Sequence, residues 1–237
     1  MDSVWAHHLD ERGLLVRSAP GELRGVALEE RKPPSPPVAY HGRKSVVTWW
    51  WSATTRTQVA CGSLRRMRVA IGLDWDPSVA WFSGEPVELR WQTTKGRRRR
   101  WRPDFIARTT DGDRIVVAVE PEKPDQEWRD KLVLLHTVAA EAGWRVEVRQ
   151  VPHGVRRNTL EWLAEYRGPD PIEDEAACEQ ALLRAFAEPR TLIDGARASG
   201  IPELLALDHA YRLIWRHRLH IDWDAPLLPT ARAWAAA

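Results

Sequence analysis

The residues of this chain that could do chemistry gather between positions 95 and 123. Residues 97 to 102 read Arg-Arg-Arg-Arg-Trp-Arg and run directly into Pro103 and Asp104, at the start of an apolar stretch. Arginine guanidinium groups bind the phosphates of nucleic acids, and an aspartate carboxylate can hold a divalent ion such as Mg²⁺. This order of residues therefore suggests a site for metal-dependent cleavage of a phosphodiester.

This order of residues resembles that of PD-(D/E)xK nucleases, and the resemblance implies a second acid and a lysine on the strand that follows. Placed two residues apart on one strand, both side chains point into the same site. The next apolar stretch, residues 114 to 121, has Ala118 at the expected acid position and Glu120 at the expected lysine position. Lys123 follows, but prolines flank it, so it replaces the lysine only if the end of the strand bends. The scaffold of a nuclease is recognisable, whereas most of its catalytic positions are replaced.

The elements that must position these residues alternate between strands and helices. Two strands are expected around a polar turn, and Ser63 is expected to cap a helix that ends near Leu73. Residues 93 to 97 are expected to form a hairpin turn, and a second helix from 125 to 142 should end at Gly143. The expected strands are residues 46–51, 55–60, 79–82, 87–91, 101–108, 114–120 and 144–151. This mixture predicts an α/β domain over residues 46 to 167.

The rest of the chain divides into an arm, a linker and a second small domain. Residues 1 to 45 show little periodicity and contain a run of prolines, which predicts an extended N-terminal arm. Residues 168 to 172 read as a linker. Residues 173 to 237 have three short helices and a terminal strand pair, a pattern typical of a winged helix. A helical docking domain of the same topology, without DNA contact, is the alternative.

The formal net charge of only +2 hides a strong segregation of charge. A basic region in a near-neutral protein fits a polyanionic partner. The residues expected to contact DNA are Lys95, Arg97, Arg98, Arg99, Arg100, Arg102, Arg66, Arg212 and Arg216. The two cysteines lie far apart, so neither structural zinc nor a disulfide framework is expected. No apolar run has the length of a signal peptide or a membrane span, so a cytoplasmic protein without a membrane partner is expected.

Residues 49 to 121 resemble the TnsA-type family, the endonuclease subunit of heteromeric cut-and-paste transposases and a branch of the PD-(D/E)xK nucleases. The resemblance rests on the order and spacing of several short motifs. These are Trp51-Ser52-Ala53-Thr54-Thr55, Leu73-Asp74-Trp75-Asp76-Pro77, Glu85-Pro86, Arg102-Pro103-Asp104-Phe105, Asp111-Gly112 and Val116 to Pro121. The resemblance implies a restriction-endonuclease-like fold, a central mixed sheet flanked by helices, that nicks transposon 5′ ends. It also implies a transposase subunit and an ATPase regulator as partners.

The family mechanism requires four residues, and this chain keeps one of them in place. The carboxylates hold Mg²⁺, which orients a water, and a lysine stabilises charge at the phosphate. The family's helix glutamate, aspartate, strand acid and lysine fall on Arg66, Asp104, Ala118 and Glu120. The resemblance thus leaves Asp104 and Glu120 as the candidate metal ligands. An arginine at the helix position disfavours a neighbouring divalent ion and suits direct phosphate binding.

Three hypotheses follow for the function. The first is a DNA-binding subunit of a transposition machinery that acts at transposon ends, with a degenerate nuclease site. The second is an active Mg²⁺-dependent endonuclease with a migrated site made of Asp104, Glu120 or Glu122, and Lys123. The third is a non-catalytic assembly subunit that keeps the fold for protein contacts alone.

Overall fold

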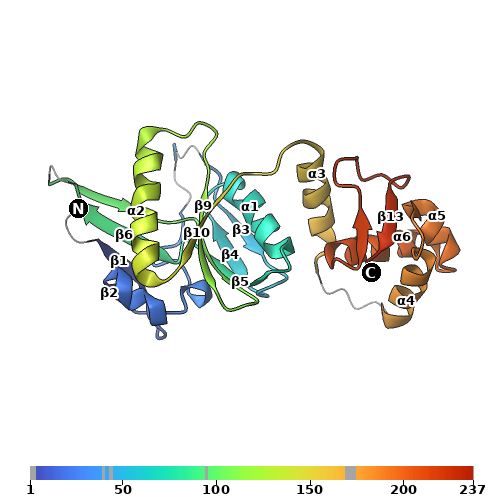
Figure 1. Ribbon diagram of the computed structural model, residues 1–237, viewed down its shortest axis with the longest axis horizontal. Helices are drawn as coiled ribbons and strands as arrows, with labels where there is room; N and C mark the ends of the chain where they lie inside the picture. Colours follow the sequence, from blue (N-terminus) through green and yellow to red (C-terminus); the bar gives the residue numbers. More distant parts are fainter. Residues whose placement is uncertain (1–3, 39–40, 43–44, 94–95, 169–174, 237) are drawn as a thin grey trace. The chain divides into compact units, whose positions relative to one another are not determined.

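The computed structural model describes residues 4–38, 41–42, 45–93, 96–168 and 175–236, and the chain is a mixed α/β protein (Figure 1). It forms two compact units, residues 1–151 and residues 152–237. The boundary lies earlier than the sequence predicted. The reason is that helix α3 (Gly154–Leu163) and the short helix η3 (Ala164–Tyr166) pack within the second unit.

The main sheet of the first unit has the strand order β10-β9-β8-β5. Its strands are β5 (Val79–Gly84), β8 (Phe105–Thr109), β9 (Arg114–Val119) and β10 (Arg145–Arg149). Strands β5, β8 and β9 are antiparallel, whereas β10 runs parallel to β9. Helix α2 (Gln126–Ala142) makes the crossover that a parallel pair requires. Asp125 caps its start, and Gly143 ends it at a φ of 73°, a conformation that favours glycine.

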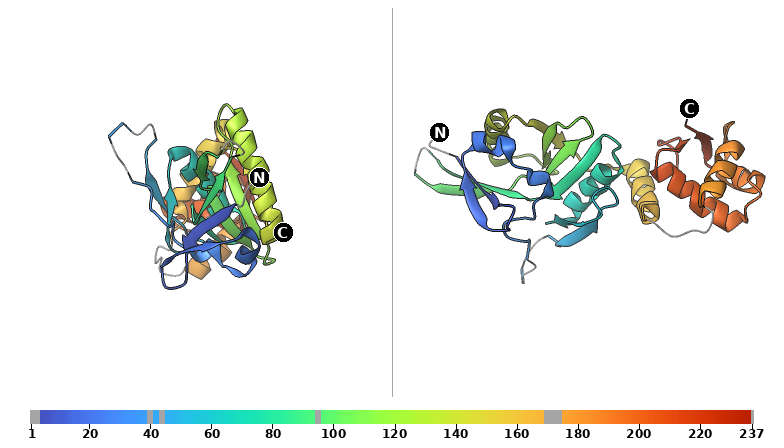
Figure 2. Two further views of the ribbon diagram at one scale, coloured as in Figure 1. Left: turned by 90° about the vertical axis from the view of Figure 1, so that its left-hand side faces the viewer. Right: turned by 90° about the horizontal axis from the view of Figure 1, so that it is seen from below.

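A second sheet of the first unit has the order β2-β1-β6-β7 and includes the N-terminal segment. Its strands are β1 (Trp5–Leu9), β2 (Leu15–Ser18), β6 (Val87–Gln92) and β7 (Arg98–Trp101). The short helices η1 (Pro20–Gly25) and η2 (Leu28–Glu30) follow the first hairpin. The prediction of an extended arm over residues 1 to 45 is therefore wrong for the segment from β1 to η2, which forms strands and short helices. The local sequence periodicity could not reveal strand β1, because this strand is held by pairing with the distant strand β6 (Figure 2).

The arginine-rich segment also differs from the prediction of a turn followed by one long strand. Arg98 to Trp101 form β7, which pairs with β6 in the second sheet. The chain leaves that sheet at Arg102 and enters the main sheet at Phe105. Pro103 lies between the two strands, where its missing N–H prevents a continuous ladder. The arginines and Asp104 thus belong to two different sheets.

One hydrophobic core lies beneath α2 and joins both sheets of the first unit (Figure 1). Ala6 and Leu89 come from the second sheet, and Ile106 and Val116 come from the main sheet. From α2 the core takes Leu134, Leu135, Val138, Ala139 and Ala142. The periodic apolar positions of α2 thus bury one helix face, as its amphipathic sequence predicts.

Helix α1 (Leu64–Trp75) packs against the hairpin of β3 (Thr48–Trp51) and β4 (Gln58–Cys61). The buried carboxylate of Asp74 ties them together. It accepts hydrogen bonds from Trp50 Nε1 at 2.9 Å and Ser52 Oγ at 2.6 Å. It also accepts the backbone N–H groups of Ala53 and Thr54. The polar turn at Ser52 and the Leu-Asp motif of the sequence therefore have a structural role, because a buried carboxylate needs these donors.

The second unit packs its remaining helices beside a three-stranded antiparallel sheet of order β11-β13-β12. Its elements are α4 (Glu175–Ala185), β11 (Arg190–Thr191), α5 (Leu192–Ala198), α6 (Glu203–Trp215), β12 (Leu219–Ile221) and β13 (Arg232–Ala235). A Cβ at Gly195 would lie 2.1 Å from the Phe186 ring, so α5 needs glycine there. No helix among the described residues is long and apolar enough to cross a membrane.

Candidate functional site

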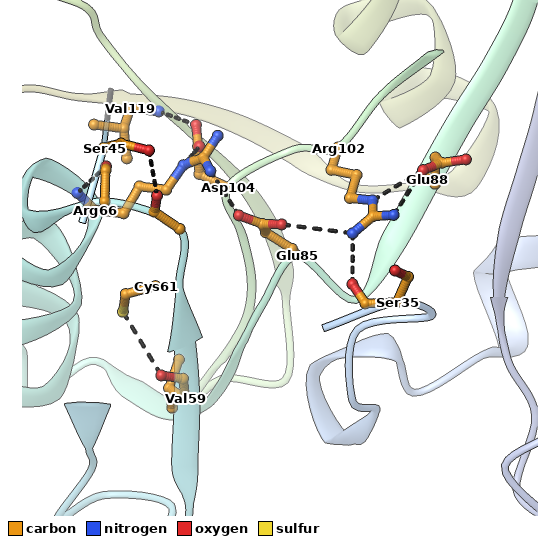
Figure 3. A network of polar contacts seen from close by, with 12 residues as sticks. Ser35, Ser45, Val59, Cys61, Arg66, Glu85, Glu88, Arg102, Asp104 and Val119 are labelled. Atoms are coloured by element: carbon orange, nitrogen blue, oxygen red, sulfur yellow. Dashed lines mark hydrogen bonds and ion pairs between the residues drawn. The ribbon is translucent and has the colours of Figure 1, made fainter. Parts of the chain in front are cut away.

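Asp104 lies just before β8, beside β9, and is held on every side (Figure 3). Its carboxylate Oδ2 accepts the backbone N–H of Val119 at 2.6 Å, and Oδ1 accepts Nε of Arg66. Its backbone N–H donates to Val117 at 3.1 Å, and its carbonyl accepts the N–H of Glu85 at 3.0 Å. Both carboxylate oxygens are thus engaged within the protein.

Arg66 occupies the space between two buried carboxylates (Figure 3). It lies in the first turn of α1, where its own N–H donates to the capping Ser63. Its guanidinium pairs through Nε with Asp104 and through Nη1 with Glu85 Oε1 at 2.6 Å. The Arg66 side chain is 28% exposed, whereas each carboxylate side chain is 7% exposed. An arginine from the helix therefore supplies the positive charge that these acids need.

Glu85 is a site residue that the sequence analysis did not identify. It lies between β5 and β6 and has a φ of 52°, which is uncommon for a residue that precedes a proline. Its hydrogen bond to the Asp104 carbonyl holds this conformation, and its carboxylate points at Arg66. The only signal in the sequence was the Glu85-Pro86 pair of the resemblance.

Arg102 continues the same network and does not point freely into solvent. Its Nε and Nη2 donate to Glu88 Oε2 at 2.9 and 2.8 Å, and its Nη1 donates to the Ser35 carbonyl at 2.6 Å. Nη1 also lies 3.8 Å from Glu85 Oε2. Arg90 binds the other oxygen of Glu88 at 2.7 Å. The phosphate contact expected at Arg102 therefore conflicts with its structural ion pair.

The pKa shifts of these groups reflect both their burial and the charges of their neighbours. Burial alone would lower the pKa of Arg66, but Asp104 and Glu85 outweigh it and raise that pKa. Burial raises the pKa of Asp104, while Arg66 and the Val119 N–H act in the opposite direction. Burial, followed by the nearby Glu85, raises the pKa of the Cys61 thiol to about 12. Cys61 therefore stays protonated at neutral pH and is no nucleophile.

The expected metal ligands Asp104 and Glu120 have different partners. The carboxylate of Glu120 accepts a hydrogen bond from Gln150, and its carbonyl accepts Arg65 Nη1 at 3.3 Å. Arg65 also pairs with Glu122 at 2.6 Å. A shallow pocket of about 330 Å³ contains this group, and its lining does not include Asp104.

The side chains around Asp104 do not fit a divalent cation. No group of three or more His, Cys, Asp or Glu side chains that could hold a metal occurs within the described ranges. The positive charge of Arg66 opposes a second cation beside it. Ala118 is buried in the core beneath α2, and Lys123 is exposed on the segment that leads to α2.

The basic residues expected to bind DNA fall into two groups. Arg97, Arg98, Arg99 and Arg100 are exposed on and just before β7. Arg212 is buried and bonds Asp208 and the Gly168 carbonyl, each at 2.9 Å, and Arg216 pairs with Glu175. Arg212 therefore supports packing inside the second unit, whereas Arg216 is exposed and forms a surface ion pair. Lys95 lies outside the described residues.

Comparison with protein-family models gives no match to this chain, and comparison with curated proteins gives none either. The observations that bear on function are therefore the contacts of Arg66 and the exposed arginines of β7. Arg66 forms ion pairs with two buried carboxylates, whereas the arginines of β7 are exposed to solvent.

Proposed function

We propose that this chain is a DNA-binding subunit of a transposition machinery. In its nuclease-type site, Arg66 takes the place of the metal ion. The observation that carries the proposal is the pairing of Arg66 with both Asp104 and Glu85. In the family that the sequence resembles, the helix position supplies a glutamate to the metal site. Here the same position supplies a cation, which satisfies the remaining carboxylates directly.

The arrangement of elements supports a restriction-endonuclease-like fold for the first unit. Asp104 lies just before β8, and the neighbouring antiparallel strand β9 carries the acid position, with the lysine position just after its end. Helix α1 brings the third position to the same place through Arg66. Helices α4, α5 and α6 and the antiparallel strands of the second unit support a winged-helix-like domain.

Binding without cleavage is the chemistry that this site favours. A metal-dependent nuclease uses the ion to lower the pKa of a bound water and to polarise the phosphate. A guanidinium has no coordination position for water, and it already donates to two carboxylates. The family lysine is also replaced by Glu120, whose carboxylate would repel an approaching phosphate.

The exposed arginines of β7 supply the means of binding DNA. Arg97, Arg98, Arg99 and Arg100 present four guanidinium groups to solvent. Contacts of this kind bind the phosphate backbone of transposon ends with little sequence preference and strong salt dependence. A transposase subunit and an ATPase regulator would be the protein partners, in the cytoplasm.

The experiment that tests this proposal measures binding and nicking of a labelled transposon-end duplex. The wild type and Asp104→Asn are compared in Mg²⁺, in Mn²⁺ and in EDTA. We expect salt-sensitive binding with no nicking, unchanged by EDTA. Nicking that requires metal and disappears in Asp104→Asn would instead establish an active enzyme with displaced acids, and absence of any DNA binding would refute the proposal.

A further inference from the structure

The sheet β2-β1-β6-β7 has two faces of opposite character. Residues directly opposite one another on paired strands point to the same face. Ala6 pairs with Leu89, and Leu89 pairs with Trp101, so these side chains share the face toward the core. The residues between them along each strand must point outward, because side chains alternate along a strand.

The outward face is mostly basic and aromatic, and two or three strands contribute to each of its rows. Trp5 of β1 pairs with Arg90 of β6, which pairs with Arg100 of β7. The next row along the sheet joins Arg17 of β2, His7 of β1 and Glu88 of β6, and Gln92 pairs with Arg98 at the other end. Three of these residues, Trp5, His7 and Arg17, come from the N-terminal hairpin.

A surface hollow of about 720 Å³ opens on this sheet. Its lining consists of Trp5, His7, Arg17, Arg90, Trp91, Gln92, Arg98, Arg99 and Arg100. The guanidinium carbon of Arg17 lies 3.8 Å from the centroid of the Trp5 ring. Arg17 is exposed, so a flat cation lies on an aromatic ring with its outer side toward solvent.

Only part of the positive charge of the hollow is balanced within the protein, through the pairing of Arg90 with Glu88. Its lining contains five arginines and no acid. The nearby carboxylate of Glu88 is already bound by Arg90 and Arg102. Burial lowers the pKa of His7, and the positive charges of Arg90 and Arg17 lower it further. Among the described residues, no carboxylate forms a salt bridge with Arg98 or Arg100.

We propose that this face binds an unpaired strand of nucleic acid, with phosphates on Arg90, Arg98 and Arg100 and a base on the Arg17–Trp5 pair. The inference rests on the proposed DNA-directed function and adds a second site to it, separate from Asp104. The strand that becomes unpaired beside a processed DNA end has the required chemistry.

The geometry of the face matches the repeating chemistry of a single strand. Successive outward residues of one strand are about 7 Å apart, so β6 and β7 offer a row of hydrogen-bond donors for consecutive phosphates. An unpaired base can stack on an aromatic ring or on an arginine plane, whereas a paired base inside a duplex cannot. The arginines therefore account for affinity, and the Arg17–Trp5 pair accounts for a preference for single strands.

The test measures the affinity of the full chain for a labelled single strand of about 20 nucleotides and for the matching duplex. In the triple variant Arg90→Gln/Arg98→Gln/Arg100→Gln, we expect at least a tenfold loss of single-strand affinity. The slope of log K against log salt should fall by about 2, since each lost phosphate contact removes about 0.7. Arg17→Lys keeps the charge but loses the plane, so it should weaken single-strand binding only.

The matched control is Arg12→Gln/Arg145→Gln/Arg197→Gln, which removes the same charge from exposed positions outside the hollow. It should leave single-strand affinity within about twofold, and thermal unfolding of each variant reports on the fold. An equal loss in the control, or a wild type that prefers duplex and ignores Arg17→Lys, would overturn the inference. Binding that survives in the first triple variant refutes this site alone, whereas a wild type that binds no nucleic acid refutes the proposed function as well.

Discussion

Two sets of arginines in the first unit have the same chemistry and opposite surroundings. Arg66 and Arg102 reach buried acids, whereas Arg98 and Arg100 stand on an exposed strand without a salt bridge among the described residues. The first pair offsets the cost of burying Asp104, Glu85 and Glu88. The second pair leaves its charge available to a polyanion. Identical side chains, as close in sequence as Arg100 and Arg102, are therefore structural in one place and available for binding in the other.

The same contrast in surroundings distinguishes the nuclease-type site at Asp104 from the hollow on the second sheet. A nuclease site needs carboxylates that a metal ion can reach. Arg66 already occupies that role for Asp104 and Glu85, so their charge is satisfied inside the fold. On the sheet face the charge is not satisfied in this way, since its hollow is lined by arginines and by no carboxylate. Only the second region can gain substantially from binding an external anion.

The strongest test of the buried set is the substitution Arg66→Met. It leaves two buried carboxylates without their cation, so we expect a loss of about 3–5 kcal/mol in the free energy of unfolding, measured by urea denaturation. Adding Asp104→Asn to this variant should cost less than the same change in the wild type, because the two residues interact directly. Additive costs would show that Arg66 does not neutralise Asp104.

The paired substitutions Arg102→Gln and Arg100→Gln test the division between the two sets. Arg102→Gln should lower the free energy of unfolding by about 2 kcal/mol, because Oε2 of Glu88 loses both of its hydrogen bonds from Arg102. Arg100→Gln should change stability by less than about 0.5 kcal/mol, yet weaken DNA binding several-fold. Urea denaturation and fluorescence anisotropy measure both quantities on both variants. A large loss of stability in Arg100→Gln together with weaker DNA binding in Arg102→Gln would mean that Arg100 is structural and Arg102 binds DNA.

The substitution Arg66→Glu tests whether the arginine stands in the place of a metal ion. It would put a third carboxylate beside Asp104 and Glu85, a set of oxygen ligands that suits Mn²⁺ or Mg²⁺. We expect this variant to be unstable in EDTA and to gain about 1–2 kcal/mol in Mn²⁺ at ten to thirty times the dissociation constant. The wild type and Arg66→Met serve as controls and should not respond. Equal changes of stability with Mn²⁺ in all three proteins would show that Arg66 does not stand in the place of a metal ion.

Local patterns in the sequence predicted the elements well where tertiary contacts agreed with them. The helices α1 and α2 follow from capping residues and apolar spacing, and helices α4, α5 and α6 of the second unit follow from the same rules. The prediction failed at β1 and β7. Both strands carry charged or aromatic residues on one face and exist because they pair with β6.

The sequence by itself determined the positions of Asp104 and Arg66, the exposed run of arginines and the replacement of the acid and lysine by Ala118 and Glu120. The tertiary structure alone decided which arginine meets which acid. Arg66 and Asp104 are 38 residues apart, and Arg66 and Glu85 are 19 apart. An ion pair depends on the distance between two groups in space, and that distance follows from how helix and sheets pack.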